Sequence, residues 1–236
     1  MRNTFTFGNV TSSTYGVYIT GTGTYNAPER DYETIAVPGR DGAVLGIEKR
    51  LQNVELTYPA FIYANFKTNI ASLKAALLSQ TGYQRLSDTY HPDEYRLAVY
   101  RGGMDVDARK QHDAGEFDIE FECKPQRYLT SGETTTTFTA NGTISNPTLF
   151  NSRPLIRVTG YGTLTINSDV ITITQSTNTY VDIDSELMDC YKGSVNMNGL
   201  VAFQANDFPV LVPGSNSISF SGNITKVAVT PRWWSV

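Results

Sequence analysis

Hydrophobic and polar residues alternate in two segments of the N-terminal half, the pattern of a β-strand with one buried face. In residues 52–58, Val54, Leu56 and Tyr58 share a face. Residues 116–124 separate the apolar Phe117, Ile119, Phe121 and Cys123 from the acidic Glu116, Asp118, Glu120 and Glu122. We expect the acidic face of this second strand to lie in water or against a basic partner.

A helical period occupies residues 66–79, where one apolar stripe contains Phe66, Ile70, Leu73 and Leu77. Asn65 precedes it as a candidate N-cap, and Gly82 follows its end. A single helix cannot cover both faces of a sheet. The pattern therefore predicts an α+β N-terminal domain with one helix rather than βαβ repeats.

The C-terminal part shows only short β-type runs, at residues 155–158, 170–174, 180–183, 217–220 and 227–229. Turn signals separate them, among them Asn146-Pro147, Asn198-Gly199 and Pro213-Gly214. No helical period of useful length appears in this region. The spacing predicts a small β-sandwich, so the fold class as a whole is mainly β.

Charge density marks the boundary between the two parts. Residues 1–128 contain 30 charged residues in 128, and residues 129–236 contain only 12 in 108. The polar, Thr-rich stretch at 131–137 between them is typical of a linker or an edge strand. We predict an N-terminal domain at 1–130, a linker at 131–137 and a C-terminal domain at 138–236.

Composition excludes several classes of protein. The net charge is -4 and no basic stripe is present, which argues against specific nucleic-acid binding. No apolar run approaches the roughly 18 residues of a membrane span, so we expect no membrane insertion. The first residues contain no apolar signal core, and nothing points to export. Cys123 and Cys190 are far apart, which favours two buried free thiols over a disulfide.

Candidate catalytic groups are few. His91 and His112 lie in charged, loop-like segments without metal-ligand spacing, so each is interpreted as a solvated loop histidine. Four carboxylates cluster near a strand end: Asp182, Asp184, Glu186 and Asp189. Asp182 and Asp184, on one face, could form the acid and base pair of a glycosidase. Charged residues around a turn are the simpler interpretation. We expect no enzymatic activity, no metal and no cofactor.

Trp233-Trp234 raises an alternative function, a carbohydrate-binding β-sandwich that recognises host cell surfaces. Adjacent strand residues point to opposite faces, so the pair cannot form one flat platform for a sugar. We expect one tryptophan in the core and the other against a partner or another domain.

Residues 28–42 differ from both domains. Alternating charges flank a predicted strand at 33–37, and two turn signals follow, Pro38-Gly39 and Asp41-Gly42. This pattern suits a solvated hairpin. A protruding turn with Arg40 beside Asp41 also suits a contact between identical subunits. We name Arg30, Arg40 and Asp41 as candidate interface residues.

The same segment, with its core Val37-Pro38-Gly39-Arg40-Asp41-Gly42, resembles the distal tail protein (Dit) family of siphophages and prophages of Gram-positive bacteria. Four further stretches are similar to that family in order and spacing. They are Phe7-Gly8 with Ser13, Gly16 and Val17; residues 121–129; Asn146-Pro147-Thr148 with residues 154–156 and 160–162; and Phe208-Pro209 through Pro213-Gly214 and Asn216 to residues 231–234.

The resemblance implies a virion structural protein made in the host cytoplasm and located at the tail tip. N-terminal domains of that family form a hexameric ring at the distal end of the tail tube, and galectin-like or carbohydrate-module-like C-terminal sandwiches project outward. The implied partners are further copies of the chain, the tail tube protein, the tail-associated lysin or fibre protein, and receptor-binding baseplate proteins. The family motif labels no individual contact residue.

Overall fold

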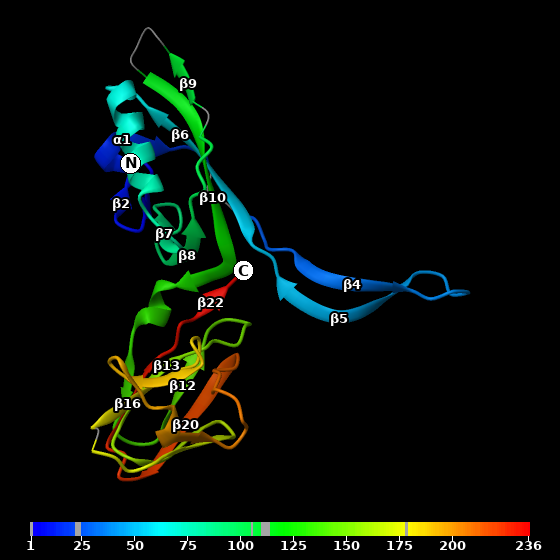
Figure 1. Ribbon diagram of the computed structural model, residues 1–236, viewed down its shortest axis with the longest axis vertical. Helices are drawn as coiled ribbons and strands as arrows, with labels where there is room; N and C mark the ends of the chain where they lie inside the picture. The colour runs from blue at the N-terminus through cyan, green and yellow to red at the C-terminus, as the bar shows by residue number, and fades with distance from the viewer. Residues whose placement is uncertain (1, 22–24, 105, 110–113, 178) are drawn as a thin grey trace. The chain divides into compact units, whose positions relative to one another are not determined.

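The computed structural model describes residues 2–21, 25–104, 106–109, 114–177 and 179–236, with only the backbone described at 47–49 and 107–109. The chain divides into two compact units, residues 1–127 with 236 and residues 128–235. The described residues are mainly β-strand, as expected, with one α-helix (Figure 1). That helix and the short 3₁₀ turns include no stretch long and apolar enough to cross a bilayer.

The first unit is built on an antiparallel sheet. Its strands follow the order β2-β1-β7-β8-β10-β6-β3, and β9 also pairs with β10. Their bounds are β1 (Phe5–Phe7), β2 (Val10–Thr11), β3 (Val17–Ile19), β6 (Val54–Ile62), β7 (Gln84–Asp88), β8 (Glu94–Val99), β9 (Val106–Arg109) and β10 (Ala114–Leu129). A 3₁₀ turn, η1 (Ser12–Tyr15), links β2 to β3. Both predicted alternating segments lie in this sheet, in β6 and β10.

Helix α1 (Phe66–Leu78) buries the predicted apolar stripe, and its four residues join the sheet's hydrophobic cluster. The helix approaches the sheet so closely at Gly115 that a Cβ there would lie 2.1 Å from Phe66 Cε2. Asn65 occupies the N-cap position, but the predicted side-chain cap is wrong. Its φ of 52° is left-handed, and its side chain makes no capping hydrogen bond.

The second unit contains two antiparallel sheets around one core, a β-sandwich. One sheet has the order β11-β21-β13-β16-β17-β18: β11 (Thr136–Phe138), β21 (Lys226–Thr230), β13 (Leu155–Thr159), β16 (Tyr180–Asp184), β17 (Asp189–Lys192) and β18 (Val195–Asn196). The other has the order β12-β20-β14-β15-β19: β12 (Gly142–Asn146), β20 (Gly214–Gly222), β14 (Gly162–Ile166), β15 (Asp169–Ile173) and β19 (Val201–Phe203). A 3₁₀ turn, η3 (Asn198–Leu200), precedes β19.

Residues 131–137, expected as a linker or an edge strand, lie in the second unit. They form most of a 3₁₀ turn, η2 (Thr130–Glu133), and the start of β11, which is at the edge of its sheet. Nearby, within the second unit, Leu129 N donates to Trp233 O at 2.9 Å, just before the last strand, β22 (Trp234–Ser235). The last strand is thereby tied to the chain segment that enters the sandwich.

Candidate subunit interface

Residues 30–51 form a hairpin outside the main sheet of the first unit. Strands β4 (Arg30–Ala36) and β5 (Ala43–Leu51) pair with each other and with no other described strand. Figure 1 shows the hairpin standing apart from the sheet. The register shifts between Arg30 and Tyr32 and again between Tyr32 and Thr34. Such irregularities increase the local twist of a ribbon.

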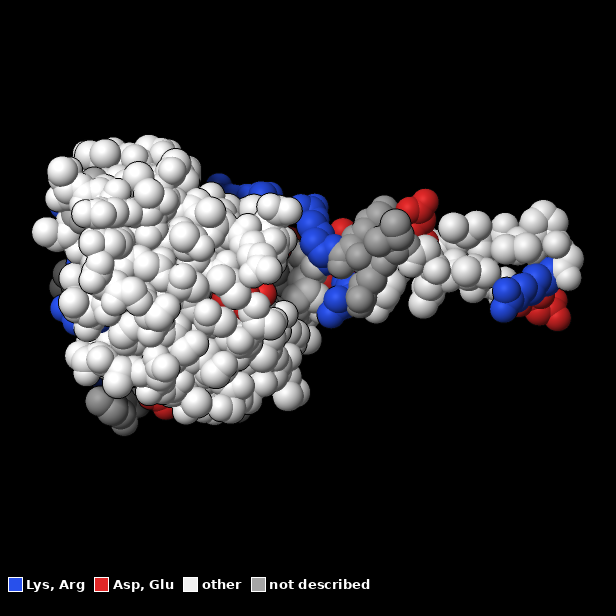
Figure 2. All heavy atoms as spheres, turned by 90° about the horizontal axis from the view of Figure 1, so that it is seen from below, with Lys and Arg blue, Asp and Glu red and all other residues white. Residues whose placement is uncertain are grey.

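The described side chains of the hairpin are almost all exposed, although many are apolar. Tyr32 is 52% exposed, Ile35 49%, Val37 40% and Leu45 62%. The register pairs Ile35 with Val44 and Thr34 with Leu45, so apolar groups occupy both faces of the ribbon. In Figure 2 an uncharged stretch of the hairpin separates the charged groups at its tip from those nearer its base.

The predicted interface residues lie at the two ends of this hairpin. Arg40 and Asp41 are exposed in the turn, where Arg40 N donates to Val37 O at 3.2 Å. Gly39 and Gly42 take φ values of 80° and 79° there, which favour glycine. Arg30 begins β4, about 20 Å from its other end at 3.4 Å per residue. The structure therefore brings Arg40 and Asp41 together and leaves Arg30 at the base.

Several hydrogen bonds fix the base of the hairpin. Asn26 Nδ2 donates to Glu55 O at 2.6 Å, which joins the segment before β4 to β6. Gln52 N donates to Glu29 O at 2.8 Å, and Gln52 Nε2 donates to Asp31. These contacts hold the two strands together at their root. They leave the apolar outer half without a covering layer.

The acidic face of β10 is partly solvated and partly paired. Glu116, Asp118 and Glu120 are exposed. Glu122 accepts a hydrogen bond from Asn53 Nδ2 at 2.7 Å and forms an ion pair with Arg101. The negative charge of Glu122, at one end of this acidic face, is therefore balanced within the chain.

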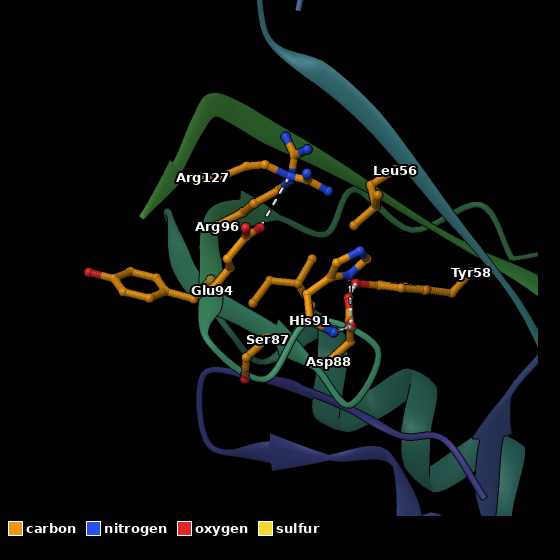
Figure 3. Close-up of a pocket in the computed structure, with 10 residues that line it drawn as sticks. Leu56, Tyr58, Ser87, Asp88, His91, Glu94, Arg96 and Arg127 are labelled. Carbon is orange, nitrogen blue, oxygen red and sulfur yellow. Dashed lines mark hydrogen bonds and ion pairs between the residues drawn. The ribbon is translucent and has the colours of Figure 1, made fainter. Parts of the chain in front are cut away.

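The structure places His91 differently from the sequence prediction. Its side chain is only 15% exposed, so the solvated loop histidine is wrong for this residue. His91 Nδ1 lies 3.2 Å from Asp88 Oδ1, and the ring lines a small pocket with Arg96 and Arg127 (Figure 3). His112 lies outside the described residues. Sequence reasoning missed Arg96, although its alternation with Ala98 in β8 places it on the buried side.

Asp182 and Asp184 face the same side of β16, as alternation predicts, and both are buried in ion pairs. Arg157 Nε and Nη2 donate to Asp182 at 2.6 and 2.8 Å. Arg232 Nη1 and Nη2 donate to Asp184 at the same two distances. Burial by itself raises the pKa of Asp184, but the Arg232 guanidinium and the backbone N–H of Leu187 outweigh it and hold this pKa below its usual range. The pair is bound in the sheet rather than presented to a substrate.

The two tryptophans have different surroundings. Trp233 is 5% exposed and belongs to the core of the sandwich. Trp234 is half-buried, stacks on Phe150 with 4.4 Å between ring centroids, and donates from Nε1 to Asn151 O at 2.9 Å. The two tryptophan rings therefore do not share one platform, as the strand alternation predicts.

Both cysteines are free and buried, as expected. Burial raises the pKa of the Cys123 thiol and of the Cys190 thiol to about 12 in each case. Cys123 lies in the core of the first unit and Cys190 in that of the second. Their thiols therefore act as apolar core groups.

Comparison with known proteins relates this chain to phage tail proteins. Residues 10–123 match the family model of the phage tail protein RIFT-related domain. The fold of the whole chain is similar to the crystal structure of the Dit protein of phage SPP1, described as a paradigm of the hub adsorption apparatus in phages that infect Gram-positive bacteria. The TM-score is 0.74 at 14% identity, over 100% of both chains. The resemblance to distal tail proteins is thus confirmed.

A second solved structure, the baseplate of phage P2 in its activated conformation with Ca, matches 97% of this chain and 98% of its own at 10% identity, with a TM-score of 0.49. No curated protein sequence matches the chain significantly.

Proposed function

We propose that this chain is the hub of a siphophage tail tip, where six copies form a ring at the distal end of the tail tube. The domain at 1–130 builds the ring, and the sandwich at 138–236 faces outward. The ring joins the tube protein to the tail-associated lysin or fibre protein and anchors the receptor-binding baseplate proteins. The role is one of assembly and requires no catalytic group. The phage tail domain at 10–123 and the fold shared with SPP1 Dit support this proposal.

The observation that carries the proposal is the exposed hairpin. An isolated two-stranded hairpin is marginally stable in water, and each of its strands offers one unpaired edge. Here both faces also expose apolar side chains, Ile35 and Leu45 among them. A neighbouring copy that covers the outer half would bury these groups and order the edges. In a ring, the same contact repeats head to tail until it closes.

The charged turn adds specificity to this contact. Arg40 and Asp41 give the tip one charge of each sign, so a partner surface must match both. Charges at the rim of an interface set register and rate of association more than affinity. In the proposal, the apolar outer half supplies most of the affinity, and Arg40 with Asp41 selects the correct docking position.

The native mass of the purified chain tests the proposal. Six copies of 26.1 kDa amount to about 157 kDa, and we expect light scattering on a sizing column to give this mass and negative stain to show rings. Leu45→Asp should shift the protein to the monomer mass, because a charge then replaces an apolar group in the interface. Leu149→Asp, at an 88% exposed leucine of the second unit, is the matched control and should leave the ring intact.

A wild-type protein that stays monomeric even with the purified tube protein would overturn the ring. A ring that survives Leu45→Asp would overturn the hairpin contact alone.

A further inference from the structure

A small cavity, lined in part by charged side chains, lies in the first unit close to the root of the hairpin. Strands β6, β7, β8 and β10 and the turn at His91 supply its lining. Its volume is about 20 Å³, room for one water-sized particle. Figure 3 shows the His91 ring beside Asp88, with the guanidinium groups of Arg96 and Arg127 above it. Two ring or guanidinium nitrogens in this lining, Arg96 Nη1 and His91 Nε2, are buried without a hydrogen-bond partner.

Arg96 is a buried cation without a carboxylate. It is 6% exposed, and its hydrogen bond from Nη2 reaches only a carbonyl, Asn26 O, at 3.4 Å. No ion pair of Arg96 is found among the residues that the structure describes. Burial and the nearby Arg127 lower its pKa. A buried charge without a counter-charge is strongly destabilising. A bound anion would therefore stabilise the folded state by neutralising this guanidinium.

The neighbouring carboxylates are already occupied. Asp88 Oδ2 accepts from the Tyr58 hydroxyl at 2.5 Å, and Oδ1 accepts from the backbone N–H groups of Tyr90 and His91 at 2.9 Å. Glu94 lies 3.5 Å from Arg127 Nε. Glu94 still raises the pKa of Arg96 electrostatically, but by less than burial and Arg127 lower it, so neither carboxylate fully compensates the Arg96 guanidinium.

His91 supplies the second donor when it is protonated. Its Nδ1–H then donates to Asp88, and its Nε2–H is, like Arg96 Nη1 in the same lining, buried without a hydrogen-bond partner. With His91 charged, the ionic groups of the lining are Arg96, Arg127 and His91 against Asp88 and Glu94. The remaining groups facing the ring, Tyr58 and the edge of Tyr25 at 5.2 Å, are neutral. The positively charged groups of the lining then outnumber the negatively charged groups by one.

We propose that this cavity is a binding site for a single monatomic anion of the halide class, held between Arg96 Nη1 and His91 Nε2. A space of about 20 Å³ favours a monatomic anion over a tetrahedral oxyanion such as sulfate or phosphate. The ion neutralises Arg96 and accepts a hydrogen bond from His91 Nε2. Because Arg96 Nη2 also holds Asn26 O, the ion supports the segment that leads into β4.

Bromide provides the direct test. Crystals of the full chain grown in sodium bromide at about pH 5.5 should give an anomalous difference peak at the bromine edge between Arg96 Nη1 and His91 Nε2. Matched crystals at about pH 8.5 should give a weaker peak. Density at this position without anomalous signal at the lower pH would show a water and overturn the proposal.

Thermal melting gives an independent readout in solution. At constant ionic strength, replacing gluconate with bromide should raise the melting temperature of the first unit, and more so at about pH 5.5 than at about pH 8.5. A bromide concentration of about five times Kd should raise the free energy of unfolding by roughly 1 kcal/mol. For a domain of this size, that corresponds to about 4 °C.

Two variants assign this response to the site. Arg96→Met and His91→Gln should each abolish the bromide-specific rise. Arg101→Met, at an arginine whose side chain is 75% exposed, should keep it. If a variant at position 96 fails to fold, His91→Gln and the wild-type crystals still decide the matter. A bromide response equal in wild type and His91→Gln would overturn the proposed ligand set.

Discussion

Strands β6 and β4 belong to the same unit, yet their apolar residues have opposite surroundings. Along β6 every second residue is buried, from Val54 to Ile62. Along β4 no residue is buried, although Tyr32 and Ile35 are as apolar as their counterparts. Strand β6 has β10 on one side, β3 on the other and helix α1 over its inner face, whereas β4 has only β5.

This difference separates residues that stabilise the monomer from residues available to a partner. Burying a large apolar side chain contributes about 1.5–3 kcal/mol, and an exposed one contributes little to folding. Apolar groups of the hairpin gain this energy only when another surface covers them. Substitutions in the sheets should therefore change stability, and substitutions in the hairpin should change assembly.

The largest effect on folding is expected at Phe121, in the core of the first unit. Its ring is 1% exposed and packs against Phe5, Phe7 and Tyr58. Phe121→Ala should lower the free energy of unfolding by about 3–5 kcal/mol. Urea denaturation followed by far-UV circular dichroism measures it. Phe61→Ala, on the half-buried outer side of β6, should cost clearly less; equal losses would contradict the inward orientation of Phe121.

The buried ion pair of the second unit should have the next largest effect. Arg232→Met leaves the Asp184 carboxylate buried and uncompensated, which costs about 3 kcal/mol, the low end for such pairs because the Arg232 side chain is 27% exposed. Both tryptophans lie in this unit, so the midpoint of their fluorescence change in urea reports it. Arg153→Met, at an exposed arginine, is the control and should be near neutral.

The same pair predicts a pH dependence. The pKa of Asp184 in the folded chain lies below its unfolded value, so its contribution is fully present above the unfolded pKa of about 3.9 and is lost as pH falls through the folded pKa. Wild-type stability of the second unit should therefore fall at acid pH. Arg232→Met should show a shallower dependence. Identical pH profiles would contradict the assignment of this stabilisation to Arg232.

The smallest effect on stability is expected at the hairpin tip. Arg40→Glu should weaken assembly by reversing one charge of the contact, while the melting temperature and circular dichroism of the monomer stay nearly unchanged. Sedimentation velocity over a concentration series measures the loss of rings. Lys67→Glu makes the same charge change at an exposed position of α1 and should assemble normally. If both variants assemble like wild type, Arg40 makes no ring contact.

Regular patterns made much of the fold predictable. Strand β10 buries the apolar side of the alternation in residues 116–124, and helix α1 buries the apolar stripe from Phe66 to Leu77. Both were predictable because a hydrophobic period of 2 or 3.6 residues indicates which face of a strand or helix is buried. Residues 28–42 were recognisable by their turns and charges. Alternation could not show that Ile35 and Leu45 stay exposed, since the pattern of a strand does not reveal whether another layer covers it.

The candidate sites were harder to predict from the sequence because the residues that interact with each site residue are distant from it in the chain. Arg232 binds Asp184 across 48 residues, and Arg157 binds Asp182 across 25. Sequence spacing made the two carboxylates a possible catalytic pair, and only the strand pairing supplied the arginines. His91 was expected in solvent for the same reason, because Tyr58 and Arg96, which line the same cavity, come from other strands.

The sequence by itself determined the local elements, the mainly β class and the resemblance to distal tail proteins, because these depend on residue periodicity, turn chemistry and motif order along the chain. The tertiary structure alone decided which charges are buried and paired, which apolar strands remain uncovered, and that Arg96 and His91 share a cavity. Those properties depend on contacts between segments far apart in sequence, and the free energy of a charge or an apolar group is set by what surrounds it rather than by its neighbours in the chain.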